Sequence, residues 1–189
     1  MKMCGLSFRL FFALLALLLF SGCASSVMMA SQPLVLDQPD KAMVTFMRPS
    51  YFGGAIQFGL WDSDQFIGVL SAGNQIQYLT EPGEHLFLAR AENWSYVKAD
   101  LAAGKQYFIL GNIFPGIWKA RVALAPVIIP GNHTEAELAA WQQKLKPTQV
   151  IPEKFDAYKA PRVDQVRTAV AEFREGKVKY AELSKEAGR

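Results

Sequence analysis

Residues 55–70 read AIQFGLWDSDQFIGVL, and this stretch decides the fold class. In its first half, large apolar side chains occupy every second position, namely Ile56, Phe58 and Leu60. A period of two with one apolar face predicts a β-strand. The tripeptide DSD at 62–64 supplies a turn, and the FIGVL that follows supplies a second strand. The stretch therefore predicts a β-hairpin.

Runs of the same kind continue on both sides of this hairpin, from residue 41 to about residue 130. They are separated by turn residues, among them Pro82 and Gly83, which stand where a type II turn favours them. We predict strands at 43–47, 55–61, 66–70, 75–80, 85–91, 95–101, 106–110 and 117–124. The predicted fold class is therefore mainly β, an antiparallel β-sandwich of about seven to eight strands over residues 40–130.

Four short motifs occur in order within this region, with a glycine before the second: FMRPS at 46–50, FIGVL at 66–70, EPGEH at 81–85 and GKQYF at 104–108. Together they resemble the DUF2846 family of bacterial domains, which are often lipoproteins and are akin to PEGA-type and transthyretin-like β-sandwiches. The similarity covers roughly residues 40 to 125. It implies the same sandwich fold. It implies no reaction, because that family has no established activity.

A C-terminal α-helical extension is predicted over residues 131–189. Thr134 and Glu137 have the spacing of a capping box, so a helix should begin there and end before Pro147. A second helix is predicted from residue 162 to about residue 187, where apolar and charged positions follow a helical period.

The second predicted helix carries an apolar stripe made of Val163, Val166, Val170 and Phe173. Spacings of three and four residues place these side chains on one face of a helix. The stripe would either pack against the sandwich or the first helix, or bind a partner protein of the cell envelope.

The start of the chain resembles the export signal of a bacterial lipoprotein. Lys2 and Arg9 are followed by an uncharged apolar run over residues 10–20, and the sequence then reads FSGC up to Cys23. As a helix the run would cover only about 17 Å, against a bilayer core of about 30 Å. FSGC resembles the lipobox, which implies cleavage between Gly22 and Cys23 and a diacylglyceryl group on the Cys23 thiol. The alternative is an ordinary export signal with an incidental cysteine.

The lipobox resemblance also implies a location. Residues 1–22 would be the signal peptide, and residues 23–39 would be a lipidated tether with a reach of about 20 Å. Ala24, rather than an aspartate, follows the cysteine, which in lipoproteins points to the periplasmic face of the outer membrane. The predicted partners are a membrane, through the lipid anchor, and an envelope protein.

Charge and cysteine content exclude several function classes. The chain has 20 basic and 17 acidic residues, and loss of Lys2 and Arg9 would leave 18 against 17, so the charge does not favour a nucleic-acid partner. Cys4 would leave with the signal and Cys23 would carry lipid. No thiol would remain for a disulfide, a nucleophile or a metal site. No cofactor and no metal are predicted.

Two candidate ligand-binding features remain. Lys119 and Arg121 would share one face of a strand, either as a basic strip for lipid phosphate or an anionic glycan, or as the charges that keep an edge strand soluble. Arg48 and Tyr51, on either side of Pro49, would form a functional loop or a plain turn.

The sequence contains no recognisable catalytic constellation. It has no Gly-x-Ser-x-Gly motif, and its two histidines, His85 and His133, stand far apart. We therefore predict a protein that is not an enzyme, a lipoprotein anchored in the outer membrane that acts as an interaction or scaffolding module of the envelope. The alternative is a binding module for an anionic glycan or lipid headgroup.

Overall fold

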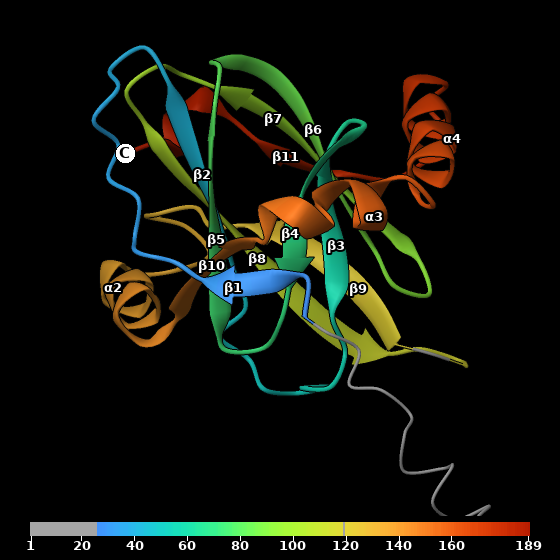
Figure 1. Cartoon of the computed structure of the whole chain (residues 1–189). Coiled ribbons are helices and arrows are strands. Elements are labelled where there is room, and N and C mark those ends of the chain that lie inside the picture. Colours follow the sequence, from blue (N-terminus) through green and yellow to red (C-terminus); the bar gives the residue numbers. More distant parts are fainter. Residues whose placement is uncertain (1–25, 119) are drawn as a thin grey trace, which may run out of the picture.

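The structure is a computed structural model that describes residues 26–118 and 120–189. Within them the chain is mainly β, with eleven strands in two mixed sheets and short helices toward the C-terminus (Figure 1). No helix in these two ranges is long and apolar enough to cross a bilayer. The predicted signal peptide, its cleavage site between Gly22 and Cys23, and Lys119 lie outside the described residues.

All eight strands predicted between residues 41 and 126 are present. They are β2 (Ala42–Met47), β3 (Phe58–Asp62), β4 (Gln65–Leu70), β5 (Asn74–Thr80), β6 (Gly83–Arg90), β7 (Trp94–Leu101), β8 (Gln106–Pro115) and β9 (Ala120–Pro126). β3 and β4 form the predicted hairpin, in which Phe58 lies opposite Leu70. Ser63 in its turn has a φ of 49°, a left-handed conformation that tight turns require.

The sheets are mixed rather than antiparallel, which corrects the predicted fold class. β10 (Lys146–Val150) lies parallel to β5, and β11 (Ala181–Leu183) lies parallel to β7. β2 and β8 are also parallel, with Met43 opposite Gln106. With β1 (Met28–Ala30) at its edge, one sheet has the order β1-β10-β5-β2-β8-β9, and the other has the order β11-β7-β6-β3-β4. The three strands that the sequence did not predict, β1, β10 and β11, are short or polar. They therefore lack the alternation of apolar side chains that predicts the other strands.

The segment predicted as a flexible tether contains the strand β1 (Met28–Ala30). β1 pairs antiparallel with β10, and the next backbone N–H, that of Ser31, donates to the Pro147 carbonyl at 3.1 Å. The Met28 side chain lies against β4, where a β-carbon on Gly68 would be 3.1 Å from its terminal methyl. Residues 28–31 are therefore part of the fold and not of a tether.

The main core lies between the two sheets. Alternate side chains of each strand point inward, so that Phe46 of β2 meets Phe87 of β6 edge to face, with ring centroids 5.2 Å apart. Tyr107 and Ile109 of β8 and Leu101 of β7 are fully buried in the same cluster. The apolar alternation in the sequence therefore marks the face that each sheet turns to the other.

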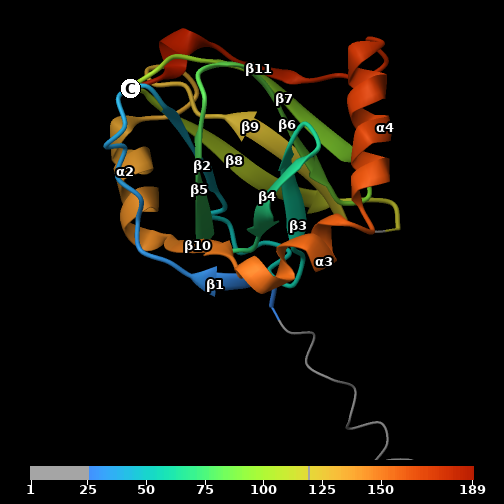
Figure 2. The ribbon, with the colours of Figure 1, turned by 45° about the horizontal axis from the view of Figure 1, so that its top comes forward.

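Helices cover the outer faces of the sheets, α2 (Glu135–Lys144) on one side and α4 (Val163–Arg174) on the other (Figure 2). Leu138 of α2 packs in a cluster with Met47 and Phe108 of the first sheet. The helix α3 (Phe155–Lys159), which follows the 3₁₀ turn η1 (Pro152–Lys154), joins α4 on the second sheet. With both faces covered, β2 is buried at every position.

The first predicted helix is confirmed. Thr134 caps α2: its hydroxyl accepts the Glu137 N–H at 3.2 Å, and the Glu137 carboxylate accepts the Thr134 N–H at 2.8 Å. This reciprocal pair is the capping box. α2 ends at Lys144, ahead of Pro147, as predicted.

The second predicted helix is shorter than expected. α4 ends at Arg174, and Gly176 then adopts a left-handed conformation with a φ of 69°, which is a common way for a helix to stop. The chain continues into β11 and the 3₁₀ turn η2 (Lys185–Ala187). The prediction of helix beyond residue 174 is therefore wrong.

The last residues close the fold. Leu183 of β11 is buried in the core between the sheets. Arg189 exchanges two backbone hydrogen bonds with Gln106 at 2.9 and 3.1 Å, and its guanidinium pairs with the Glu135 carboxylate of α2. Gly188 is packed against the Tyr107 ring so closely that a β-carbon there would be 2.5 Å from it.

Candidate ligand-binding site

Arg48 is buried and holds a loop together, contrary to its predicted role in ligand binding. Its side chain is 0% exposed. The guanidinium donates hydrogen bonds to the carbonyl oxygens of Phe52 at 3.1 Å, of Gly53 at 2.8 Å and of Ile56. It also lies 5.7 Å from the centroid of the Phe58 ring, and burial lowers the pKa of Arg48. Its role is therefore to fix the loop over residues 51–56.

Tyr51 points outward from that loop. Its ring is exposed, and Lys144 Nζ lies 5.6 Å from the ring centroid. Its hydroxyl lies beside Gly73, where a β-carbon would be 2.7 Å away. Arg48 and Tyr51 therefore do not form one binding surface, which corrects the loop prediction.

The apolar stripe of α4 is used inside the molecule. Val166 and Val170 are buried, and Val163 and Phe173 are half-buried. Three residues of the stripe, Val166, Val170 and Phe173, share an apolar cluster with side chains on the outer face of the second sheet: Trp61, Phe66, Val69, Leu86, Leu88 and Tyr96. Of the two alternatives open for this stripe, packing on the sheet is the one that Val166 and Val170 adopt, so these two side chains are not available to a partner protein.

Arg121 is exposed on β9, opposite Phe114 of β8. Its neighbour Val122 is buried, as the predicted alternation requires. The start of β9 is tied to the turn between β6 and β7, because the carbonyl of Ala120 accepts the N–H of Glu92 at 2.9 Å. Lys119 is not described, so the predicted basic strip is represented by Arg121 alone.

A hollow beside the β6–β7 turn is the strongest candidate for a ligand site. Its volume is about 470 Å³, and it lies between that turn, β3, α3 and the start of α4. It is lined by Gly59, Trp61, Arg90, Ala91, Trp94, Tyr158, Arg162, Gln165 and Val166. We call it the Arg90–Arg162 pocket.

One wall of the Arg90–Arg162 pocket is the end of a hairpin. Arg90 ends β6 opposite Trp94, the first residue of β7, and its guanidinium carbon is 5.3 Å from the Trp94 ring centroid. Between them, the Asn93 side chain exchanges two 2.9 Å hydrogen bonds with the backbone of Val122 in β9. These bonds hold the turn, so the stacked Arg90 and Trp94 are presented in a defined orientation.

The helices supply the other wall. The guanidinium carbon of Arg162, the residue before α4, is 3.9 Å from the centroid of the Tyr158 ring, and its Nη1 donates to the Tyr158 carbonyl at 2.9 Å. Tyr158 also stacks on Phe66, with ring centroids 4.6 Å apart. Gly59 has no side chain, and this leaves space for the Tyr158 hydroxyl, because a β-carbon at residue 59 would be 3.0 Å from the hydroxyl oxygen. Burial raises the pKa of the Tyr158 hydroxyl, so this group stays neutral.

The Arg90–Arg162 pocket carries positive charge without a compensating carboxylate. Two of its lining residues are arginines, and none is an aspartate or a glutamate. Neither arginine forms an ion pair with a carboxylate of residues 26–118 or 120–189. Because the guanidinium faces rest on aromatic rings, their N–H edges can still donate to a carboxylate or a phosphate.

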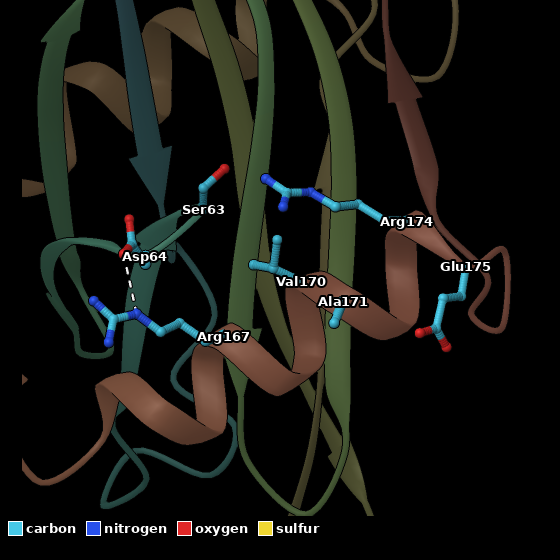
Figure 3. Close-up of a pocket in the computed structure, with 7 residues that line it drawn as sticks. All are labelled: Ser63, Asp64, Arg167, Val170, Ala171, Arg174 and Glu175. Carbon is cyan, nitrogen blue, oxygen red and sulfur yellow. Dashed lines mark hydrogen bonds and ion pairs between the residues drawn. The ribbon is translucent and has the colours of Figure 1, made fainter.

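A second hollow, also of about 470 Å³, lies between α4 and the β3–β4 turn (Figure 3). One of its two arginines is already paired: Arg167 Nε is 3.3 Å from Asp64 Oδ2, and Arg167 Nη1 is 3.6 Å from Asp164 Oδ1. Arg174 and Glu175 lie at its other end. Since charges of both signs are present, this hollow is a weaker anion site than the Arg90–Arg162 pocket.

His85 is held by two acceptors. Its Nδ1 is 2.7 Å from Asp62 Oδ2, and its Nε2 is 2.9 Å from the Glu81 carbonyl oxygen. The hydrogen bond to Asp62 raises the pKa of His85, and Tyr78 donates to the same carboxylate at 3.3 Å. Because both ring nitrogens are engaged in these hydrogen bonds, neither is free to take a proton from a nucleophile as a general base.

Sequence reasoning missed the Arg90–Arg162 pocket because its parts are distant in the chain. Arg90 and Trp94 flank a predicted turn, which is a weak local signal, but nothing in the sequence joins them to Tyr158 or Arg162. No group of three or more His, Cys, Asp or Glu side chains that could hold a metal ion occurs in the described part of the chain. Searches against protein-family models, curated proteins and solved structures found no match for this chain.

Proposed function

We propose that this protein is a lipid-anchored, non-enzymatic binding module of the bacterial envelope that holds an anionic group in the Arg90–Arg162 pocket. The ligand class is an anionic glycan or a lipid headgroup. The observation that carries the proposal is the pair of arginines on one aromatic hollow with no carboxylate partner among the described residues.

The chemistry of the pocket suits a ring that bears an acidic group. A guanidinium fork binds a carboxylate or a phosphate with two parallel hydrogen bonds. The faces of Trp94 and Tyr158, with Trp61 of β3, give the rest of the ligand an apolar surface. α4 begins at the pocket, so the positive end of its dipole adds to the charge of Arg162.

The envelope location is a proposal that depends on the FSGC motif ending at Cys23. Mass spectrometry of the mature N-terminus tests it: we expect Cys23 to be the first residue and to carry a diacylglyceryl group. Assignment to the DUF2846 family is likewise a proposal, based on the four ordered motifs. An unmodified Cys23 would contradict the anchor and leave the pocket proposal standing.

The scaffolding role predicted from the sequence has less support. The stripe that would have contacted a partner packs on the second sheet. A scaffold contact through α4 would have to use its exposed face, which carries Asp164, Arg167 and Glu172. Such charged surfaces are typical of solvent-facing helices.

The pocket is tested with small anionic probes and the purified full chain. The chain has four tryptophans, so indole N–H signals can be followed by NMR during titration with glucuronate or glycerol 3-phosphate, with glucose as the neutral probe. We expect both anions to shift the Trp94 signal and glucose to leave it in place. In an Arg90→Gln, Arg162→Gln double variant the Kd should rise at least about tenfold, since a charged hydrogen bond contributes about 1.5–3 kcal/mol.

Arg121→Gln is the matched control, because it removes an exposed arginine outside the pocket. We expect it to leave the Trp94 titration unchanged. If Arg121→Gln abolishes anion binding and the double variant does not, the ligand binds at the basic strip on β9 and the pocket proposal is wrong.

A further inference from the structure

The turn between β8 and β9 exposes a group of large apolar side chains. Ile117 is 85% exposed, Trp118 is 89% exposed, and Phe114 just before them is 50% exposed. Ile117 and Trp118 are the most exposed large apolar residues of residues 26–118 and 120–189. Contiguous apolar surface of this kind marks a contact with a partner or a membrane.

A loop beside β8 carries a further exposed aromatic side chain. The loop over residues 51–56 packs beside β8, since a β-carbon on Gly53 would be 3.0 Å from the Cγ2 of Ile113. Phe52 in this loop is 59% exposed. The three hydrogen bonds from Arg48 fix the loop, so the position of Phe52 is set by the fold. We call Phe52, Phe114, Ile117 and Trp118 together the apolar edge.

The described chain begins on the same side of the molecule. Figure 1 shows the start of β1, the loop over residues 51–56 and the β8–β9 turn along the lower side. Ser26 is part of this structure: its carbonyl accepts from Lys154 Nζ at 2.7 Å, and its hydroxyl accepts the Met28 N–H at 3.1 Å. From Cys23 to Ser26 is three residues, which span about 10 Å at full extension. A lipid on Cys23 would therefore hold this side of the fold close to the bilayer.

We propose that the apolar edge inserts into the headgroup region of the membrane that carries the Cys23 lipid. This inference rests on the proposed lipid anchor, but not on ligand binding in the Arg90–Arg162 pocket. Trp118 and Phe114 suit this depth, because aromatic rings settle at the boundary between headgroups and acyl chains. Arg121, which lies opposite Phe114 across the hairpin, can reach lipid phosphate from the same edge.

The bilayer is the occupant that the chain geometry favours. With so few residues between the anchor and the fold, the membrane is the surface nearest to the apolar edge. Burying the edge adds to the anchor, since each apolar side chain removed from water strengthens attachment. It would also place the Arg90–Arg162 pocket near the headgroups, because the β6–β7 turn is hydrogen-bonded to the start of β9.

The inference is tested by depth-dependent fluorescence quenching with the full, membrane-expressed chain. The protein is reconstituted in vesicles of phosphatidylethanolamine and phosphatidylglycerol whose acyl chains carry bromine near the headgroup. We expect brominated vesicles to quench part of the tryptophan emission. Trp118→Phe should remove most of that quenching, and Trp141→Phe should preserve it, because Trp141 lies on α2 and is not part of the apolar edge.

Ile117→Glu provides a second arm, since this exposed side chain can be changed without disturbing the core. We expect it to reduce the quenching of Trp118 severalfold while the unfolding midpoint is retained. Quenching that is the same in Trp118→Phe as in the unmodified sequence would overturn the inference.

Mass spectrometry of the same samples separates the two proposals. A lipidated Cys23 with no quenching of Trp118 contradicts the inserted edge and leaves the anchor intact. An unmodified Cys23 contradicts the anchor, and the inference then fails with it.

Discussion

His85 lies between the Asp62 carboxylate and the Glu81 carbonyl, and this arrangement makes stability depend on pH. Because both partners accept hydrogen bonds, the folded state favours the imidazolium, and the pKa of His85 is raised above 6.5. A raised pKa means that the folded state holds its proton more tightly than the unfolded chain. The resulting stability is fully present below pH 6.5 and is lost as the pH rises through the folded-state pKa.

We predict that Asp62→Asn lowers the pKa of His85 and flattens the pH dependence of the unfolding free energy above pH 6.5. The ring protons of His85 report the pKa by NMR, and urea unfolding at a series of pH values reports the stability. His133→Gln is the control, because it leaves one histidine in the chain and does not touch the Asp62 carboxylate. A His85 pKa that stays the same in Asp62→Asn would refute the assigned role of this carboxylate.

Residue roles were the hardest feature to predict from the sequence. From the sequence, Arg48 and Tyr51 on either side of Pro49 form either a functional loop or a plain turn. The structure buries Arg48 completely, and its donors meet backbone carbonyls of the loop that follows. Fully buried arginine is rare, and nothing in the local sequence shows that the loop folds back over residue 48.

At the scale of elements, α4 shows how a stripe of valines is used. Val166 is 1% exposed and packs on the outer face of the second sheet. We predict that Val166→Ala lowers the unfolding free energy by about 2 kcal/mol, from two lost methyl groups and the space they leave. Thr168→Ala, on the exposed face of the same helix, should change it by no more than about 0.5 kcal/mol. Urea unfolding measures both, and equal effects would mean that the stripe is not packed.

The sequence predicted elements well where a local pattern exists. The alternating runs located all eight strands of residues 41–126, and the Thr134–Glu137 spacing located α2. β1, β10 and β11 were missed because each is short and forms only by pairing with a distant strand. The helix from Arg162 was predicted too long because charged residues continue a helical period past Gly176, whose left-handed conformation ends α4.

At the scale of the whole molecule, the C-terminal segment is as much a part of the core as the hairpins. We predict that removal of residues 177–189 lowers the melting temperature by about 10 °C, because the loss of buried Leu183 alone costs roughly 3 kcal/mol. Differential scanning calorimetry measures this. Leu183→Ala should reproduce most of the loss, and Glu182→Ala, on the exposed side of β11, should not. A shortened chain with an unchanged melting temperature would contradict this account.

Only the local features of the candidate ligand sites could be predicted from the sequence. Arg121 was correctly placed on an exposed face because strand alternation is local. The Arg90–Arg162 pocket needs a hairpin end and two helices to meet, and this meeting depends on α4 packing over the second sheet. Long-range packing of this kind leaves no periodic trace in a single sequence.

The backbone exchange between Gln106 and Arg189 has a consequence for the order in which the protein matures. Residues 181–189 leave the ribosome after all the other strands of the two sheets, and until then one sheet lacks its edge strand, β11. A nascent chain can therefore assemble hairpins, but it cannot complete its core until β11 has been synthesised. This late completion of the core would keep the polypeptide incompletely folded, as transport in an extended form requires. A chaperone or translocase could then bind the chain before the core is complete.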